Sequence, residues 1–196
     1  MTTIYFVRHG ATDNKGQIIY GRMPGFNLSE VGRKEAETVG KFLSGKGVKQ
    51  IYTSPLERTF QTADFISNEI PGSTITHSFE LNEVESTSWQ GLSPEDLYKN
   101  NSYELFINDP KAEIGSENLN QLAERMKLFT ESLAIKHKGQ SIVCVSHEFP
   151  ILALKLVLEN KPLVSLKTYH LSTCSILEFQ FDDNGKFISA KSVTGT

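Results

Sequence analysis

Short apolar runs alternate along the chain with longer segments in which apolar residues recur every three or four positions. The short runs have the length and the β-branched or aromatic content of buried strands, whereas the longer segments are typical of amphipathic helices. We predict strands over residues 4–7, 50–53, 74–81 and 141–146. We predict helices from Ser29 to about Gly45, from Ser54, from Ser93, from Ser116 to about His137, and from Phe149 to Glu159.

Two of the helical segments carry further information. Ser54-Pro55-Leu56-Glu57 combines a capping serine, a proline suited to the first helical position and the glutamate of a capping box, so Arg58 is expected in the first turn. Free backbone N–H groups in that turn favour an anion. The segment 116–137 has one apolar stripe that is too short for a coiled coil and is therefore assigned to the core: Leu119, Leu122, Met126, Phe129 and Leu133.

The end of the chain has the pattern of a β-hairpin. Residues 176–181 and 186–193 flank Asp182-Asp183-Asn184-Gly185, whose composition is that of a turn. Strands that alternate with helices indicate a parallel sheet with helices on its faces, and the hairpin adds an antiparallel edge. We therefore predict an α/β fold, a three-layer α/β/α sandwich with a mostly parallel sheet, in which residues 1–196 form a single domain.

Composition and charge narrow the function classes. The 196 residues are 38% hydrophobic and 22% charged, with a formal net charge of −3 and an isoelectric point near 6.0. Lysines and arginines form no basic block, so no nucleic-acid partner is expected. No apolar run is long enough for a membrane span, and Arg8 comes too early for a signal peptide. Cys144 and Cys174 match no zinc pattern and are expected to be buried free thiols, so we predict a cytoplasmic protein.

Chemically active side chains follow several of the predicted strands. Arg8 and His9 end the first strand, and His147 follows the strand at 141–146. Arg58 lies in the helix after the second strand, and Glu83 comes after the third. Because ligands of such folds bind beyond the carboxyl ends of the strands, we expect these five side chains to converge on one rim.

This set of residues is suited to phosphoryl transfer. A neutral imidazole is a good nucleophile, and a covalent intermediate divides a difficult substitution into two easier steps. Arg8 and Arg58 supply planar, permanently charged donors that match phosphate oxygens and can neutralise a phosphoryl group in place of magnesium. No aspartate cluster suited to a metal is evident, so neither a metal nor another cofactor is expected.

The same residues occur in an ordered series of motifs that spans nearly the whole chain. The first is Val7-Arg8-His9-Gly10-Ala11-Thr12, and the others are Gly21-Arg22, 28–36, 53–63, Leu81-Asn82-Glu83, Trp89-Gln90-Gly91 and Val145-Ser146-His147. The series resembles, motif by motif and in the same order, the histidine phosphatase superfamily, which includes cofactor-dependent phosphoglycerate mutase.

The resemblance implies a role for each of the five residues. His9 would be the phosphorylated nucleophile. Glu83 would protonate the leaving oxygen and later take a proton from water, which requires a raised pKa. Arg8, Arg58 and a protonated His147 would form the phosphate pocket.

The resemblance also points to a loop and to one departure. Asn14 and Gly21 fall where the family's loop lines the phosphate site, although Asn14 sits one position earlier than the usual asparagine. Glu148 stands where the family commonly has glycine. A carboxylate there would repel anionic substrates or select a cationic group, or it would simply face the helix dipole from the first turn, which we favour. Glu85 is an alternative acid, but the motif spacing favours Glu83.

Each residue taken alone has an ordinary structural explanation. A histidine at a strand end is usually a hydrogen-bonded structural residue, and Arg58 could form a surface ion pair with Glu57 or Asp64. Glu83 alone would be a solvated loop acid, and Trp89 is expected to pack beside the pocket. The remaining histidines are assigned structural or exposed positions: His77, His137 and His170.

Four functions follow from these observations. The favoured one is a metal-independent phosphomonoester hydrolase that acts on a small phosphorylated metabolite through a phosphohistidine intermediate. A phosphoglycerate mutase-type phosphotransferase is the alternative, disfavoured because the chain is short relative to the family's mutases. A non-catalytic phosphate-binding module would need the arginines but no acid, and a zinc hydrolase would need a clustered ligand motif.

The partner expected is a small-molecule phosphate ester, with neither nucleic acid nor membrane. The sequence determines neither the physiological substrate nor the oligomeric state. Specificity in the resembling family lies largely in the loop after Gly10 and in the segment 91–115. In this chain these segments contain mixed polar and aromatic residues without a decisive pattern: Tyr20, Arg22, Tyr98, Tyr103 and Phe106.

Overall fold

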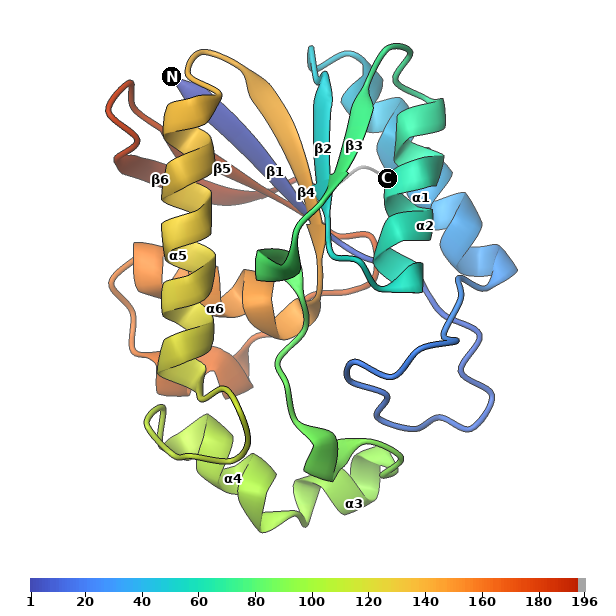
Figure 1. The fold of residues 1–196 in the computed structure, drawn as a ribbon, viewed down its shortest axis with the longest axis vertical. Coiled ribbons are helices and arrows are strands. Elements are labelled where there is room, and N and C mark those ends of the chain that lie inside the picture. Colours follow the sequence, from blue (N-terminus) through green and yellow to red (C-terminus); the bar gives the residue numbers. More distant parts are fainter. Residues whose placement is uncertain (194–196) are drawn as a thin grey trace.

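The computed structural model describes residues 1–193, in which a six-stranded sheet lies between two layers of helices (Figure 1). The strands run in the order β3-β2-β4-β1-β5-β6 across the sheet. β1 to β4 are parallel, and β5 is antiparallel to both of its neighbours. The predicted α/β sandwich with a mostly parallel sheet and an antiparallel edge is confirmed. The strands are β1 (Thr2–Arg8), β2 (Gln50–Thr53), β3 (Thr74–His77), β4 (Ser141–Ser146), β5 (Ile176–Phe181) and β6 (Phe187–Val193).

The helices form two layers and a cap. α1 (Glu30–Ser44) and α2 (Glu57–Asn68) cover one face of the sheet, and α5 (Leu119–Lys136) and α6 (Glu148–Leu158) cover the other (Figure 1). α3 (Pro94–Tyr98) and α4 (Asn101–Asn108) lie beyond the carboxyl ends of the parallel strands, at the bottom of Figure 1. Three short 3₁₀ turns complete the described chain: η1 (Phe79–Leu81), η2 (Thr87–Trp89) and η3 (Leu163–Thr168).

The apolar runs are continuous because both faces of the sheet are buried. Successive residues of β1 point to opposite faces, so Ile4 and Phe6 belong to the hydrophobic cluster that includes α5 and α6. Tyr5 and Val7 belong to the cluster that includes α1 and α2. Cys144 and Cys174 are buried free thiols, as predicted. Within residues 1–193, no helix has the length and apolarity that crossing a membrane requires.

The predicted start of the second helix is wrong. α2 begins at Glu57 with Leu56 as its N-cap, and no side chain caps it. The Ser54 hydroxyl instead turns inward and donates to Asn82 Oδ1 at 2.8 Å, where it is buried beneath the site. Arg58 still lies in the first turn of the helix, as predicted.

Two other boundaries also differ from the prediction, and one helix was not predicted. The strand predicted over 74–81 ends at His77, because its neighbour β2 ends at the paired Thr53 and offers no further partner. The helix predicted from Ser116 begins at Leu119, since Asn118 and Gln121 form a capping box there. The sequence patterns also gave no indication of α4 as a separate helix. The single-domain organisation and the cytoplasmic location stay predictions.

Candidate active site

The backbone around His9 is held in place on two sides. The His9 amide continues the β1–β4 ladder by donating to Ser146 O at 3.0 Å, and the Gly10 amide donates to Thr62 Oγ1 of α2 at 3.0 Å. Gly10 also passes so close to α1 that a Cβ atom on it would lie 2.5 Å from Gly32 O. The loop after β1 therefore fixes His9 between the sheet and two helices.

The hydrogen bonding of His9 leaves one ring nitrogen free to act as a nucleophile. Nδ1 lies 2.9 Å from Gly10 O, and because a carbonyl only accepts, Nδ1 must carry the proton. Nε2 of the neutral ring then has an available lone pair. Burial lowers the pKa of His9 well below its ordinary value, and the charges of Arg58 and Arg8 lower it further. His9 is therefore neutral at physiological pH, as a nucleophilic imidazole must be.

Arg58 is a buried cation with unused donors. Its side chain is 1% exposed and reaches Gly21 O at 2.7 Å and His147 Nδ1 at 3.1 Å, both through Nη2. The guanidinium also stacks over the Tyr20 ring at 4.7 Å. Nε and Nη1 are buried with no hydrogen-bond partner. Buried N–H groups without partners are costly, so this arginine is arranged for an anion.

Arg8 adds one unpartnered N–H donor to the two of Arg58. Its Nη1 donates to Leu171 O and lies 3.0 Å from Glu148 Oε2, whereas its Nε is buried without a partner. Glu148 Oε1 in turn accepts from the Leu171 amide at 2.9 Å and lies 2.8 Å from His170 Nδ1. Glu148 therefore contacts an arginine and a histidine, which goes beyond the helix-dipole contact we favoured from the sequence.

His147 is neutral in this arrangement, and the expectation that it is protonated is wrong. Nδ1 accepts from Arg58 and Nε2 lies 3.1 Å from Ser54 Oγ, whose own proton goes to Asn82. Burial lowers the pKa of His147 well below its ordinary value, and Arg58, His9 and two further arginines lower it further. The His147 ring packs edge-on against His9, with ring centroids 5.3 Å apart.

Glu83 has the raised pKa that a proton donor requires. Burial raises its pKa from 4.5 to about 7, and the opposing effects of the Val84 amide and the two arginines are smaller. One carboxylate oxygen accepts from the Val84 amide at 2.8 Å. The alternative acid, Glu85, is instead engaged by Arg22 at 2.9 Å. Glu83 is therefore the better candidate of the two acids.

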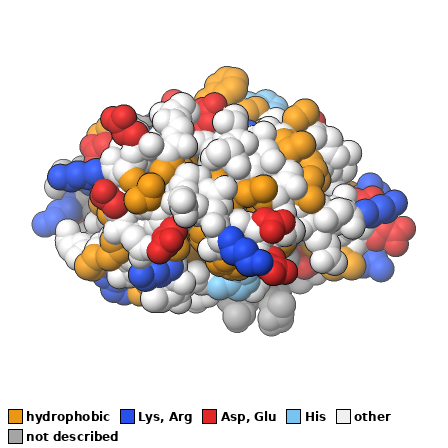
Figure 2. All heavy atoms as spheres, turned by 90° about the horizontal axis from the view of Figure 1, so that it is seen from below, with side chains coloured by type: hydrophobic (Ala, Val, Ile, Leu, Met, Phe, Trp, Pro, Cys, Tyr) orange, Lys and Arg blue, Asp and Glu red, His pale blue; other side chains and the backbone are white. Residues whose placement is uncertain are grey.

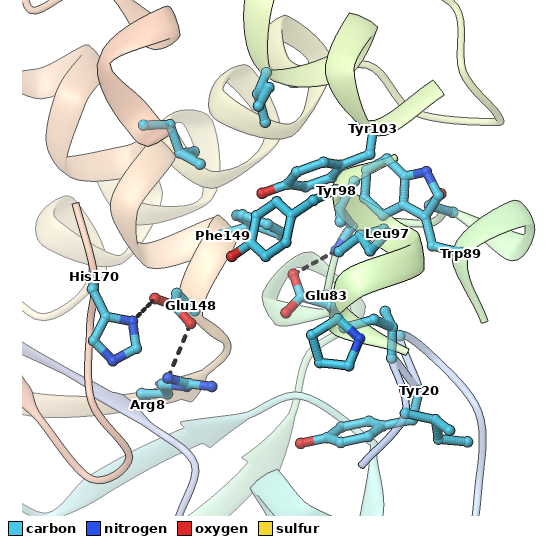
Figure 3. A pocket seen from close by; sticks show the side chains of 18 of the residues that line it. Arg8, Tyr20, Glu83, Trp89, Leu97, Tyr98, Tyr103, Glu148, Phe149 and His170 are labelled. Carbon is cyan, nitrogen blue, oxygen red and sulfur yellow. Dashed lines mark hydrogen bonds and ion pairs between the residues drawn. The ribbon is translucent and has the colours of Figure 1, made fainter. Parts of the chain in front are cut away.

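One cavity of about 790 Å³ brings most of the predicted site residues together. Figure 3 shows Arg8 and Glu148 on one side, Glu83 near the middle and aromatic side chains opposite. His147 does not line the cavity and lies behind it, against Arg58 and His9. The predicted residues that do line it are Arg8, His9, Asn14, Gly21, Arg58, Glu83 and Glu148.

Asn14 and Gly21 stabilise the loop that borders the cavity through hydrogen bonds to or from the backbone. The Asn14 side chain donates to Ile18 O at 2.8 Å and accepts from the Ile18 amide at 3.2 Å, so both of its polar atoms hold the loop. Gly21 has a backbone φ of +46°, and its carbonyl accepts from Arg58. Both residues therefore shape the wall of the cavity, and Gly21 does so next to Arg58.

Residues 4–194 match the model of the histidine phosphatase superfamily (branch 1). The chain belongs to this superfamily. The predicted enzyme class, a phosphatase of the histidine phosphatase superfamily, is therefore confirmed.

Several relatives of this superfamily cover almost the entire chain. Phosphoserine phosphatase 1 of Hydrogenobacter thermophilus is 26% identical over 198 residues, which are 99% of this chain and 93% of the relative. A phosphoglycerate mutase of Schizosaccharomyces pombe is 28% identical over 204 residues, covering 95% and 93%. The structure of phosphoserine phosphatase from Entamoeba histolytica, in complex with 3-phosphoglyceric acid, superposes with a TM-score of 0.86 at 24% identity, covering 100% and 99%.

Some residues of this histidine phosphatase site were not predicted from the sequence. Ser54 is hydrogen-bonded to His147, and Asn82 accepts from Ser54 behind it. His170 contacts Glu148. Ser54 lies within the Thr53–Ala63 motif, and Asn82 lies next to Glu83, so their positions in the motifs were the available signal. His170 follows η3 and no strand, so no pattern marked it.

The end of the molecule that carries α3 and α4 has surface charges of mixed sign. Figure 2, viewed from the end of the molecule that carries α3 and α4, shows hydrophobic side chains among acidic and basic ones. Within residues 1–193, no three His, Cys, Asp or Glu side chains are grouped so that they could hold a metal ion. The positive charge that is available to an anion inside the cavity therefore comes mainly from Arg8 and Arg58.

Proposed function

We propose that this protein hydrolyses phosphate monoesters of small metabolites without a metal ion, through a phosphohistidine at His9. The observation that carries the proposal is the set of buried, unpartnered N–H groups of Arg8 and Arg58 beside the unprotonated Nε2 of His9. A phosphate dianion would satisfy these donors and place phosphorus next to a nucleophile.

The first chemical step would transfer the phosphoryl group to the protein. His9 Nε2 attacks phosphorus, a P–N bond forms and the ester P–O bond breaks. Glu83, protonated over much of the physiological range because its pKa is about 7, gives its proton to the departing alkoxide oxygen. The two arginines stabilise the charge on the non-bridging oxygens throughout.

The second step would return the protein to its starting state. Glu83, now a carboxylate, takes a proton from a water molecule, whose oxygen attacks the phosphohistidine. The P–N bond breaks, inorganic phosphate leaves, and Nε2 regains its lone pair. A pKa near 7 is suited to a group that must act first as an acid and then as a base.

The mutase alternative cannot be set aside on chain length. The S. pombe phosphoglycerate mutase is matched over 93% of its length, so the argument that this chain is short relative to mutases is wrong. The likeness to phosphoserine phosphatase 1 extends over 99% of this chain and supports hydrolysis. A binding module has no use for an acid with a raised pKa, which argues against the non-catalytic alternative.

The proposal is tested by hydrolysis of p-nitrophenyl phosphate in the presence of EDTA. We expect turnover by the native protein and a loss of about 10³-fold or more in His9→Ala. His77→Ala is the matched control, because His77 is exposed and does not line the cavity, and it should keep full activity.

Two results would contradict the proposal. Undiminished turnover in His9→Ala would remove the nucleophile, and activity abolished by EDTA would point to a metal-dependent hydrolase. Exchange of phosphate between the carbons of phosphoglycerate, without release of inorganic phosphate, would favour the mutase.

A further inference from the structure

The cavity extends well beyond the two arginines and is walled by aromatic side chains. Trp89 and Tyr103 pack edge to face with centroids 5.4 Å apart, and Tyr98 packs against Tyr103 at 5.8 Å. Leu97 and Phe149 extend the same surface, opposite Arg8 (Figure 3). Trp89 and Tyr103 are 2% and 8% exposed and form the back of this wall, whereas Tyr98, at 72% exposed, carries most of its accessible surface.

The volume of the cavity indicates a sizeable leaving group. About 790 Å³ falls within the roughly 300–1,000 Å³ of pockets that enclose drug-sized ligands. A three-carbon acid phosphate would occupy the arginine end and leave Tyr98, the exposed residue of the aromatic wall, in contact with water. Because the wall gains free energy only when apolar surface covers it, its ligand must carry such surface.

The charge of Arg8 is already paired with Glu148, so a substrate carboxylate beside the phosphate would find no free cation there. The free donor of Arg8 is its Nε, because Nη1 contacts Glu148 and Leu171 O. Arg58 is buried at the phosphate end. Lys167 donates to Asn108 Oδ1 at 2.8 Å and is exposed to solvent, where an ion pair with a carboxylate contributes little. An unpaired carboxylate in a partly desolvated pocket costs free energy, which disfavours acid phosphates.

A cationic leaving group is disfavoured by the same contacts. The Glu148 carboxylate lies 3.0 Å from Arg8 Nη1, lies 2.8 Å from His170 Nδ1 and accepts from the Leu171 amide. It therefore has partners on both oxygens and needs no ammonium group from a ligand. One buried hydroxyl of the lining, Ser86 Oγ, has no partner and is available for a single hydrogen bond.

We propose that the substrates are phosphate monoesters of uncharged alcohols with a large apolar, preferably aromatic, body, and that the Glu148–Arg8 pair selects against carboxylated esters. The proposal rests on the hydrolase function above and specifies its substrate class. The proposed substrates differ from those in the names of two relatives, a phosphoserine phosphatase and a phosphoglycerate mutase, because both names specify acid phosphates.

The first test compares kcat/KM for esters that all release an aliphatic alcohol. We expect 2-phenylethyl phosphate to exceed ethyl phosphate, O-phosphoserine and 3-phosphoglycerate by at least about tenfold, because only the phenyl group covers the aromatic wall. Using alkyl esters throughout limits differences in the intrinsic reactivity of the leaving group.

Tyr98→Ala tests the aromatic wall. Tyr98 is 72% exposed, so its removal leaves the folded core intact. The variant should lower kcat/KM for 2-phenylethyl phosphate about fivefold more than for ethyl phosphate. Phe79→Ala is the matched control: Phe79 is 74% exposed and does not line the cavity, so neither ester should be affected.

Glu148→Gln tests the selection against carboxylates. Glutamine keeps an oxygen for the Leu171 amide but releases Arg8 from the ion pair. We expect the ratio of kcat/KM for O-phosphoserine to that for 2-phenylethyl phosphate to rise about fivefold or more. The ratio is the readout, because any change in phosphate binding by Arg8 affects both esters alike.

The outcomes separate the two proposals. Hydrolysis that is His9-dependent but fastest with O-phosphoserine, 3-phosphoglycerate or a cationic ester such as phosphoethanolamine would overturn the substrate class alone. An equal loss for both esters in Tyr98→Ala, or an unchanged ratio in Glu148→Gln, would also overturn it. If the protein hydrolyses neither p-nitrophenyl phosphate nor any of these esters, the hydrolase function and the substrate class are overturned together.

Discussion

At the scale of single residues, the raised pKa of Glu83 suits a proton donor but lowers the stability of the folded protein at neutral pH. The folded protein raises the pKa of this carboxyl from 4.5 to about 7, mainly by burial. Between these two pH values the folded state keeps a proton that the unfolded chain has lost, so stability must fall as the pH rises through this window. Above the window the shift corresponds to a cost of about 3 kcal/mol.

The same reasoning predicts the behaviour of Glu83→Gln. Glutamine has no titrating group and can still accept from the Val84 amide. The variant should be more stable than the native protein by about 1–3 kcal/mol at pH 8, and this advantage should shrink towards zero near pH 5. Unfolding in guanidinium chloride at several pH values measures the difference in the free energy of unfolding between the variant and the native protein. A difference that does not change between pH 5 and 8 would contradict the raised pKa.

At the scale of elements, the contact between the β1 loop and α1 positions His9, the proposed nucleophile. Gly32 lies in the first turn of α1, and a Cβ atom on it would stand 2.0 Å from Ala11 O and 2.7 Å from Ala11 N. A Cβ atom on Gly10 would likewise lie 2.5 Å from Gly32 O. Only glycine therefore lets the loop that carries His9 pack directly on the start of the helix.

Gly32→Ala should disturb the loop even though alanine favours helices. Because the clash is with backbone atoms, we expect a loss of about 2 kcal/mol or more in the free energy of unfolding and a drop of at least about tenfold in kcat. Gly45→Ala is the control at the other end of α1, with φ of −84° and no atom within 4 Å of an added Cβ. It should stay within about 0.5 kcal/mol of the native protein. Equal stability of the two variants would show that the close packing is not required.

Comparison of the predicted with the observed elements shows which features the sequence predicts and which depend on tertiary contacts. Apolar runs on β1 and β4 predict these strands well, because both faces of each are buried and nothing else competes. The Ser54 cap is predicted wrongly, because a local capping signal cannot reveal a tertiary partner such as Asn82. The neutral state of His147 likewise depends on Arg58, which lies 89 residues away in the sequence.

At the scale of the whole molecule, the site is assembled from segments that only the fold brings together. His9 follows β1, Arg58 follows β2 and His147 follows β4, and these strands are neighbours in the order β2-β4-β1. Their parallel direction places all three residues at the same end of the sheet, the end that faces α3 and α4 (Figure 1). This convergence was predictable from the strand pattern, whereas the substrate side of the cavity depends on the packing of α3, α4 and η3.

The central claim is that His9 carries the phosphoryl group, and trapping that intermediate tests it most directly. Glu83→Gln should accept the group from p-nitrophenyl phosphate, whose leaving group needs little protonation, but should release it slowly because the base for water is missing. Quenching in alkali, where phosphohistidine is stable, followed by peptide mass spectrometry should locate one phosphoryl group on His9, and none in the double variant that also carries His9→Ala. Phosphate found on another side chain, or turnover with no trapped group at all, would contradict the account.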